Sequence, residues 1–364
     1  MAQLQNPNPN ANAHRYLLRG RKTACRSKPA KGITIKKPPP PLEITNQKKR
    51  KSSPESINRD GESKKKKKRT APPAVFSRDV IPDCSSVEDY ESLGMISKGS
   101  YGVVYRIRER ETGEILAMKE EFDGLSAASL TEIKILKYLG RHPSVVGFKK
   151  VAVDEYDGVY VVMEYLETDL KRYISLKKEG LCEIEVKSLM KKLLEGVKFL
   201  HEKGVMHRDL KPSNVLVNND GGELKICDFG LSARFGKPVY SSSVGTLWYR
   251  APELLRGVET YSSAVDMWAV GCIMAELLMK EVLFKGEDER DQYYEIIRVL
   301  GFDDEGYVER DLSEPRYSIQ DEFKSADAKL SEVGFDLLYS FLRYDPRKRI
   351  TAECALDHAW FNEL

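Results

Sequence analysis

The sequence predicts an α+β fold with two lobes, a small strand-rich lobe containing one helix and a larger helical lobe after it. From Tyr90 to about residue 166, short runs of β-branched and aromatic residues are separated by turn residues, as in sheets. From about residue 183 onward, apolar residues recur every three or four positions, which is the period of amphipathic helices. With 364 residues, 41% of them hydrophobic, the chain is long enough to bury a core.

Ahead of this body, residues 1–86 are expected to be a disordered basic arm. Residues 1–85 hold 21 Lys and Arg against 6 Asp and Glu, whereas the rest of the chain holds 38 against 50. The arm has too little apolar surface to offset the entropy of ordering. Its Lys48–Lys51 and Lys64–Arg69 blocks are typical of nuclear-import signals or nucleic-acid patches, although a solvated tail is the simpler alternative.

The location that we expect is therefore nuclear, and otherwise cytoplasmic. The partners that the arm suggests are an import receptor and nonspecific contact with nucleic acid. Six scattered cysteines without metal-binding spacing fit a reducing compartment. The first 14 residues lack an apolar stretch, and the longest apolar run is too short to span a bilayer, so we expect no secretory signal and no membrane association.

The expected elements follow in chain order. Short strands are predicted over Tyr90–Ile96, Tyr101–Arg108, Glu114–Lys119, Val145–Val153 and Gly158–Leu166, with a helix over Ser126–Tyr138. A longer helix carries apolar residues from Val186 to Leu200 at helical spacing, and Gly204 ends it. The remainder is predicted to be mostly helical.

Three features of the first lobe suit a phosphate site. Gly99 and Gly102 lie between two predicted strands, where a hairpin without Cβ atoms could approach phosphates closely. Lys119 on the third strand could reach those phosphates, and Glu132 on the first helix could hold the lysine. Each feature has a plainer interpretation: a simple turn, an exposed strand lysine and a solvated glutamate.

The string His207-Arg-Asp-Leu-Lys-Pro-Ser-Asn214 is far more specific. Asp209 could accept the proton of an attacking hydroxyl, Lys211 could offset phosphate charge, and Asn214 offers a neutral oxygen to Mg²⁺. Asp228, in the Asp-Phe-Gly string that follows, offers a carboxylate to a hard cation. Both strings in this order are rarely found without phosphoryl-transfer chemistry.

Together these motifs resemble the protein kinases, and the resemblance covers Tyr90 to about Phe361. Gly99-Ser-Tyr-Gly-Val-Val-Tyr105, Thr246-Leu-Trp-Tyr-Arg-Ala-Pro-Glu253 and Asp345-Pro-Arg-Lys-Arg349 are similar to the cyclin-dependent kinase branch of the CMGC group, and Lys211 is typical of Ser/Thr kinases. The resemblance implies a bilobal kinase domain at 90–361. Its N-lobe would be 90–163, its hinge 164–169 and its C-lobe 170–361.

The resemblance also implies a role for each matching residue, with ATP and Mg²⁺ as cofactors and proteins as substrates. Asp209 would be the proton acceptor, assisted by Lys211, Asn214 and Thr246, and Asn214 and Asp228 would hold Mg²⁺. The nucleotide would contact Ile96, Ser97, Lys98, Gly99, Ser100, Tyr101, Gly102, Val103, Val104, Ala117, Lys119, Glu132, Met163, Glu164, Leu166, Asp169 and Leu216. Ser100, Tyr101 and Ser241 match positions of regulatory phosphorylation.

Several positions depart from the family pattern. Ser97 stands where the phosphate loop has its first glycine. Thr131 replaces an arginine, and Arg234 comes one position late, so Arg208 alone remains of three arginines that would clamp an activation-segment phosphate. A lone arginine makes one charge-assisted contact, so we expect weak dependence on a phosphate at Ser241.

Three interpretations stay open at this point. The favoured one is a nuclear kinase related to cyclin-dependent kinases, with a preference for proline after the phosphorylated residue. The second keeps the chemistry without a cyclin. The third is a pseudokinase scaffold, tethered by its basic arm or binding DNA through it. Two structural contacts are also expected: Glu253 with Arg349, and Asp266 as a hydrogen-bond acceptor beneath the catalytic loop.

Overall fold

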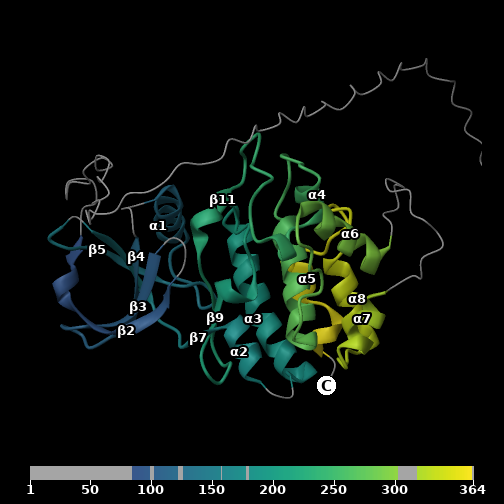
Figure 1. The fold of residues 1–364 in the computed structure, drawn as a ribbon, viewed down its shortest axis with the longest axis horizontal. Helices are drawn as coiled ribbons and strands as arrows, with labels where there is room; N and C mark the ends of the chain where they lie inside the picture. Colours follow the sequence, from purple (N-terminus) through teal and green to yellow (C-terminus); the bar gives the residue numbers. More distant parts are fainter. Residues whose placement is uncertain are drawn as a thin grey trace, which may run out of the picture. The chain divides into compact units, whose positions relative to one another are not determined.

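A computed structural model describes residues 84–98, 102–121, 126–156, 158–177, 180–301 and 318–362. The two lysine blocks of the basic arm, and Gly99, Ser100 and Tyr101 of the phosphate loop, lie outside the described residues. Figure 1 shows a sheet-containing N-lobe with helix α1 and a larger helical C-lobe. The α+β, two-lobed architecture predicted from the change of period is confirmed.

The N-lobe contains a six-stranded sheet with the order β1-β5-β6-β4-β3-β2. Its strands are β1 (Ser85–Ser86), β2 (Tyr90–Lys98), β3 (Gly102–Glu109), β4 (Ile115–Glu121), β5 (Phe148–Val153) and β6 (Val159–Glu164). Strand β1 pairs in parallel with β5, whereas the other neighbours are antiparallel. The expected end of the arm at residue 86 is therefore wrong, because Ser85 and Ser86 pair with Ala152 and Val153.

Helix α1 (Ala127–Leu139) is the helix predicted for the N-lobe. It begins where the Ser126 hydroxyl accepts a hydrogen bond from the Ser129 amide, and it ends at Gly140, whose φ of 72° suits glycine. Glu132, Ile133, Ile135, Leu136 and Leu139 are among its buried residues. The buried face therefore includes a carboxylate that needs a partner.

The C-lobe is built around two long helices. Helix α3 (Glu183–Glu202) buries one apolar stripe, while α5 (Ala264–Met279) is buried from Val265 to Met279 and forms the centre of the lobe. The surrounding helices are α2 (Leu170–Leu176), α4 (Pro252–Leu255), α6 (Glu289–Leu300), α7 (Ile319–Ser325), α8 (Glu332–Phe341) and α9 (Ala352–Leu356). Among the described residues, no helix has the length and apolarity needed to cross a membrane.

Short strands of two or three residues carry the functional loops, and of these the sequence predicted only the apolar run Val215–Val217. Strands β7 (Thr168–Asp169), β9 (Val215–Val217) and β10 (Leu224–Ile226) form one small sheet. Strands β8 (Val205–Met206) and β11 (Ala233–Arg234) form another. Two or three residues are too few to show a strand period. Pairing of β10 with β9 and of β11 with β8 holds the segments 207–214 and 227–232 side by side.

Candidate active site

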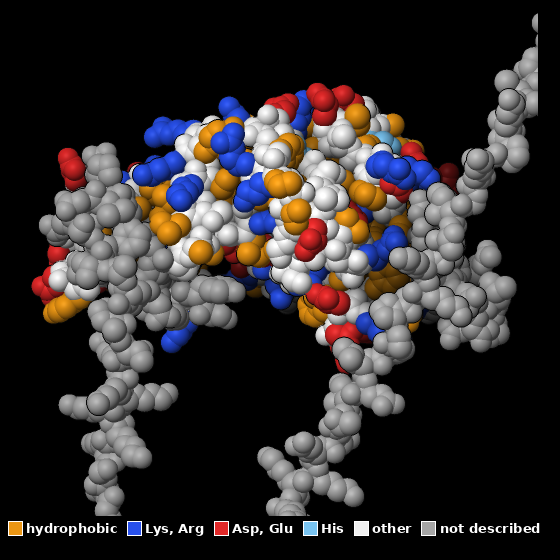
Figure 2. All heavy atoms as spheres, turned by 90° about the horizontal axis from the view of Figure 1, so that it is seen from above, with side chains coloured by type: hydrophobic (Ala, Val, Ile, Leu, Met, Phe, Trp, Pro, Cys, Tyr) orange, Lys and Arg blue, Asp and Glu red, His pale blue; other side chains and the backbone are white. Residues whose placement is uncertain are grey.

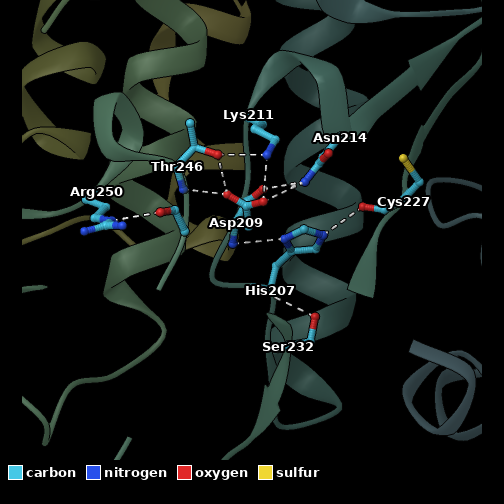
Figure 3. A network of polar contacts seen from close by, with 9 residues as sticks. His207, Asp209, Lys211, Asn214, Cys227, Ser232, Thr246 and Arg250 are labelled. Carbon is cyan, nitrogen blue, oxygen red and sulfur yellow. Dashed lines mark hydrogen bonds and ion pairs between the residues drawn. The ribbon is translucent and has the colours of Figure 1, made fainter. Parts of the chain in front are cut away.

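Asp209 lies at the centre of a hydrogen-bond network (Figure 3). Its Oδ1 accepts from the Thr246 amide at 2.7 Å and from the Thr246 hydroxyl at 2.8 Å. Its Oδ2 accepts from Lys211 Nζ at 2.8 Å and from Asn214 Nδ2 at 3.2 Å. Only 9% of Asp209 is exposed, so its carboxylate is held in one orientation by neighbours from two separate segments.

The loop that carries Asp209 is fixed from below by Asp266, near the start of α5. The Asp266 carboxylate accepts from the amides of His207 at 2.9 Å and Arg208 at 2.8 Å, and it contacts His201 Nε2 at 2.9 Å. Burial alone would raise the pKa of Asp266, but the bonds from His201 and the Arg208 amide outweigh it and hold that pKa below its usual value. Arg208 meanwhile adopts a positive φ of 69°. The anchor keeps this strained turn in place.

His207 joins the Asp209 loop to the segment that carries Asp228. Its Nδ1 accepts from the Asp209 amide at 3.3 Å, so its Nε2 carries the proton and donates to the Cys227 carbonyl at 3.0 Å. The ring is fully buried and packs edge-on against Phe229. His207 is thus a packed structural imidazole, and its bond to Cys227 holds the residue preceding Asp228 against the Asp209 loop.

The first lobe contributes Lys119 and Glu132. Lys119 Nζ on β4 lies 3.0 Å from Glu132 Oε2 on α1, and Glu132 Oε1 accepts from the Phe229 amide at 3.3 Å. Burial raises the pKa of Glu132, and the Lys119 charge opposes that rise without cancelling it. Glu132 therefore connects the strand lysine to the residue next to Asp228.

Comparison with known proteins agrees with this geometry. Residues 90–361 match the family model described as the protein kinase domain. The chain belongs to the protein kinase family. The match covers both lobes and every segment of the network described above.

The relatives that this kinase domain resembles are cyclin-dependent kinases. Cyclin-dependent kinase G-2 of Oryza sativa subsp. japonica is 48% identical over 307 residues, covering 78% of this chain and 43% of that protein. Cyclin-dependent kinase G1 of Arabidopsis thaliana is 45% identical over 77% of this chain and 50% of its own length. Cyclin-dependent kinase 11B of Homo sapiens is 43% identical over 77% and 37%. The chain thus spans at most half the length of these three relatives.

Sheet register brings the expected nucleotide-binding residues together. Val104 pairs with Ser97 on one side and Lys119 on the other, and Ala117 pairs with Met163. In the kinase domain's small sheet, Asp169 pairs with Leu216. Ile96 and Lys98 lie in β2, Gly102 and Val103 in β3, and Leu166 is buried in the segment joining the lobes.

Glu164 and Asp169 of the expected hinge have structural partners. The Glu164 carboxylate accepts from the Gly147 amide at 3.0 Å and pairs with Lys225 Nζ at 3.0 Å. Asp169 caps α2 by accepting from the Arg172 amide at 2.9 Å. Glu164 is also the last residue of β6, because it continues the pairing with Leu116 of β4.

The activation segment of the kinase domain shows where the departures lead. The Thr131 hydroxyl donates to the Ala127 carbonyl within its own helix. Arg208 donates to the Leu231 carbonyl at 2.7 Å and to the Tyr261 hydroxyl at 3.0 Å, and Tyr261 donates to the Ser241 carbonyl at 2.7 Å. Arg208, the arginine expected to bind an activation-segment phosphate, is thus connected to the backbone of Ser241 through the Tyr261 hydroxyl. Tyr261 is not among the residues predicted from the sequence.

The segment that follows is anchored as expected. Arg349 donates to both carboxylate oxygens of Glu253 at 2.6 Å, and both side chains are buried. Arg250 donates from Nε to the Gly245 carbonyl at 2.8 Å and pairs with Glu289 at 2.6 Å. Neither the pairing of Arg250 with Glu289 nor that of Tyr261 with Arg208 had a local signal, because these partners lie far apart in the sequence.

Proposed function

We propose that this chain is an active serine/threonine protein kinase that transfers the γ-phosphate of ATP to protein hydroxyl groups. The observation that carries the proposal is the setting of Asp209, whose carboxylate is oriented by Thr246, Lys211 and Asn214. Such a carboxylate is placed to accept the proton of an attacking hydroxyl. Lys211, bonded to both Asp209 and Thr246, would offset charge on the transferred phosphate.

The oxygen atoms of Asn214 and Asp228 suit the binding of a magnesium nucleotide. Asn214 uses its amide nitrogen toward Asp209, which leaves its amide oxygen for a cation. Asp228 is exposed, and within the described ranges no residue donates a hydrogen bond to its carboxylate. No cluster of three or more His, Cys, Asp or Glu suited to a metal occurs among the described residues. Mg²⁺ would be held by Asn214 and Asp228 together with phosphate oxygens.

In this proposal each residue has a defined task. Asn214 and Asp228 would hold Mg²⁺, which would neutralise phosphate charge. Lys119, aligned by Glu132, would bind the α- and β-phosphates. The adenine would lie among the side chains of Ile96, Val104, Ala117, Met163, Leu166 and Leu216. Positioning and charge neutralisation supply most of the catalysis in this class, and turnover is on the order of 1–100 per second.

A preference for proline after the phosphorylated residue is supported by Gly245. Its φ of 79° turns its carbonyl oxygen toward Arg250 Nε, at 2.8 Å. That oxygen is therefore satisfied within the chain. In a substrate, the residue after the phosphorylated one would find no acceptor for its amide N–H at the Gly245 carbonyl oxygen. Proline has no amide hydrogen, so it would leave no donor unpaired there.

A second question is whether this kinase requires a cyclin for activity. The names of the relatives describe those proteins as cyclin-dependent. In this chain α1 places Glu132 3.0 Å from Lys119, which is the arrangement that both alternatives require. Comparing turnover of the purified chain before and after adding candidate cyclins separates the two.

Nuclear location rests on the lysine blocks of residues 1–83. Figure 2 shows Lys and Arg side chains scattered among hydrophobic and acidic ones on the face drawn, so that face offers no continuous basic patch. Import and any nonspecific nucleic-acid contact are assigned to the arm because its Lys and Arg residues are contiguous in two blocks. Removing residues 1–83 should abolish nuclear accumulation and leave peptide phosphorylation unchanged.

Peptide phosphorylation by the purified full chain tests the central proposal against the pseudokinase alternative. Asp209→Asn removes the proton acceptor while keeping its size, and a loss of about 10²–10⁴-fold in kcat is expected. Asp336→Asn, at a carboxylate whose side chain is 71% exposed, is the matched control and should keep parent activity. A parent protein no faster than Asp209→Asn would establish the pseudokinase instead.

A further inference from the structure

We propose that Arg234 is a positioning residue that latches helix α1 to the C-lobe through Tyr138, and so keeps Glu132 within reach of Lys119. The latch consists of Arg234, Tyr138 and the carbonyl of Lys203. The inference rests on the proposed kinase function for its effect on activity, while its effect on α1 can be measured independently.

Tyr138 lies in the last turn of α1 and is 44% exposed as a residue, yet it is bonded on two sides. Its hydroxyl donates to the Lys203 carbonyl at 3.1 Å and accepts from an Arg234 guanidinium nitrogen at 3.3 Å. The Arg234 guanidinium carbon lies 4.2 Å from the centroid of the Tyr138 ring, within the range of a cation–π contact. Lys203 is the residue that ends α3, so Tyr138 joins the N-lobe helix to two C-lobe elements.

The backbone of Arg234 is itself fixed, which makes it a firm attachment point. Arg234 pairs with Val205 in the β11–β8 ladder, and the next residue, Phe235, donates from its amide to the Gly204 carbonyl at 2.7 Å. The Arg234 carbonyl accepts from the Tyr240 hydroxyl at 3.1 Å, and Tyr240 is buried. Since the backbone is held on both sides, the Arg234 side chain transmits a restraint to Tyr138.

The latch lies in the last turn of α1, whereas two other contacts of this helix with the C-lobe lie in its first turn and its middle. Near the first turn, a Cβ on Gly230 would lie 3.2 Å from Ala128 Cβ, so the helix already touches the Asp-Phe-Gly segment there. Glu132 accepts from the Phe229 amide in the middle of the helix. Attachment at both ends sets the direction of the helix axis, whereas contacts at one end alone would leave it free to pivot.

This arrangement accounts for the arginine that comes one position late. The family resemblance implies a phosphate clamp made partly from Thr131 and the residue before Arg234, but Thr131 bonds within its own helix and Ala233 has no charge. The side chain of Arg234 is directed to α1. An intramolecular contact of the activation segment thus restrains the helix that carries Glu132.

Amide hydrogen exchange of residues 127–139 in the full chain tests the latch without requiring activity. Arg234→Ala should raise α1 exchange about fivefold or more, since a cation–π contact and a hydrogen bond are lost together. Arg234→Lys keeps the charge without the planar fork, and Tyr138→Phe keeps the ring without the hydroxyl, so both should give intermediate values. With active sites titrated, the Michaelis constant for ATP should rise and kcat should fall in the same order.

Arg290→Ala is the matched control, because Arg290 makes the same kind of contact with Tyr294 on α6, at 5.5 Å from the ring and 3.3 Å from the hydroxyl. It should change neither readout. The latch is refuted when Arg234→Ala and Tyr138→Phe leave α1 exchange within twofold of this control. If Arg234→Ala does not fold, Tyr138→Phe and Arg234→Lys decide by the same criterion. An inactive parent protein with a normal exchange response would refute the proposed function and retain the latch.

Discussion

Arg250 Nε donates to the Gly245 carbonyl at 2.8 Å, across the turn that follows the activation segment. Gly245 holds a φ of 79°, and a Cβ there would lie 2.5 Å from the Arg208 carbonyl oxygen. Glycine is therefore required at this position by conformation and by space. The turn connects the expected substrate-binding segment to the loop that carries Asp209.

This relationship predicts substrate preference. Peptides with proline after the target serine should be phosphorylated about tenfold faster, in kcat/KM, than matched peptides with alanine, because an unpaired amide is costly. Arg250→Ala should narrow that ratio by freeing the Gly245 carbonyl. A peptide array read with both proteins provides the measurement. Equal rates for Ser-Pro and Ser-Ala peptides with the parent protein would remove the idea.

Phosphorylation of Ser241 is predicted to matter little. Arg208 is already engaged by the Leu231 carbonyl and the Tyr261 hydroxyl, and Tyr261 holds the Ser241 carbonyl. Ser241→Ala should thus lower kcat less than tenfold. Tyr261→Phe removes the hydroxyl that joins Arg208 to the Ser241 carbonyl, so it should lower kcat further than Ser241→Ala does. Ser242→Ala serves as the control. A loss of a hundredfold or more in Ser241→Ala would contradict this prediction.

Glu132→Gln should separate stability from activity. Burial raises the pKa of Glu132 in the folded state above its value in the unfolded state. Protonated Glu132 therefore stabilises the fold fully at pH values below the unfolded-state pKa. That stabilisation is lost as the pH rises through the folded-state pKa. The ionised form of Glu132 is therefore the less stable one in the fold, and glutamine, which stays neutral, should melt at a temperature at least as high as the parent. Turnover should fall about ten- to hundredfold as Lys119 loses its charged partner.

Calorimetry and kinetics on the same samples provide both numbers for Glu132→Gln. Glu114→Gln, at a carboxylate that pairs with Lys149 on the outer surface, should change neither. A melting temperature several degrees below the parent at pH 7.5 would show that the Glu132 charge stabilises the fold, contrary to the sign derived above.

The buried pair of Glu253 and Arg349 should be indispensable for folding. Arg349 also donates to the carbonyls of Arg343, Ala264 and Tyr344, so its side chain stays buried when Glu253 is changed. Loss of the Glu253 charge would therefore leave a buried guanidinium without a charged partner. Glu253→Gln is expected to cost about 3–5 kcal/mol, measured by urea denaturation. Glu91→Gln breaks a pair with Arg108 in which both side chains are nearly half exposed, and should cost about 1 kcal/mol or less. Equal costs for the two variants would contradict the expected role of burial.

Much of this site was predictable because its signals are local. The strings around Asp209 and Asp228 are contiguous, and they predicted which side chains would meet before any contact was known. The Glu253–Arg349 pair was also predicted, from the opposite charges of two residues in separate motifs. The short strands β7, β8 and β11 were not, because two residues carry no periodic pattern and their pairing energy depends on neighbours distant in sequence.

The sequence by itself determined the division into two lobes, the catalytic strings, and the threonine at position 131 where the family pattern has arginine. Each of these features is visible in consecutive residues or in a regular hydrophobic period. Only the tertiary structure decided where Arg234 points, which groups engage Arg208, and how Tyr138 connects α1 to the C-lobe. Those contacts join residues tens of positions apart. A long polar side chain has many alternative partners, and only the packed backbone fixes which of them lies within hydrogen-bond distance.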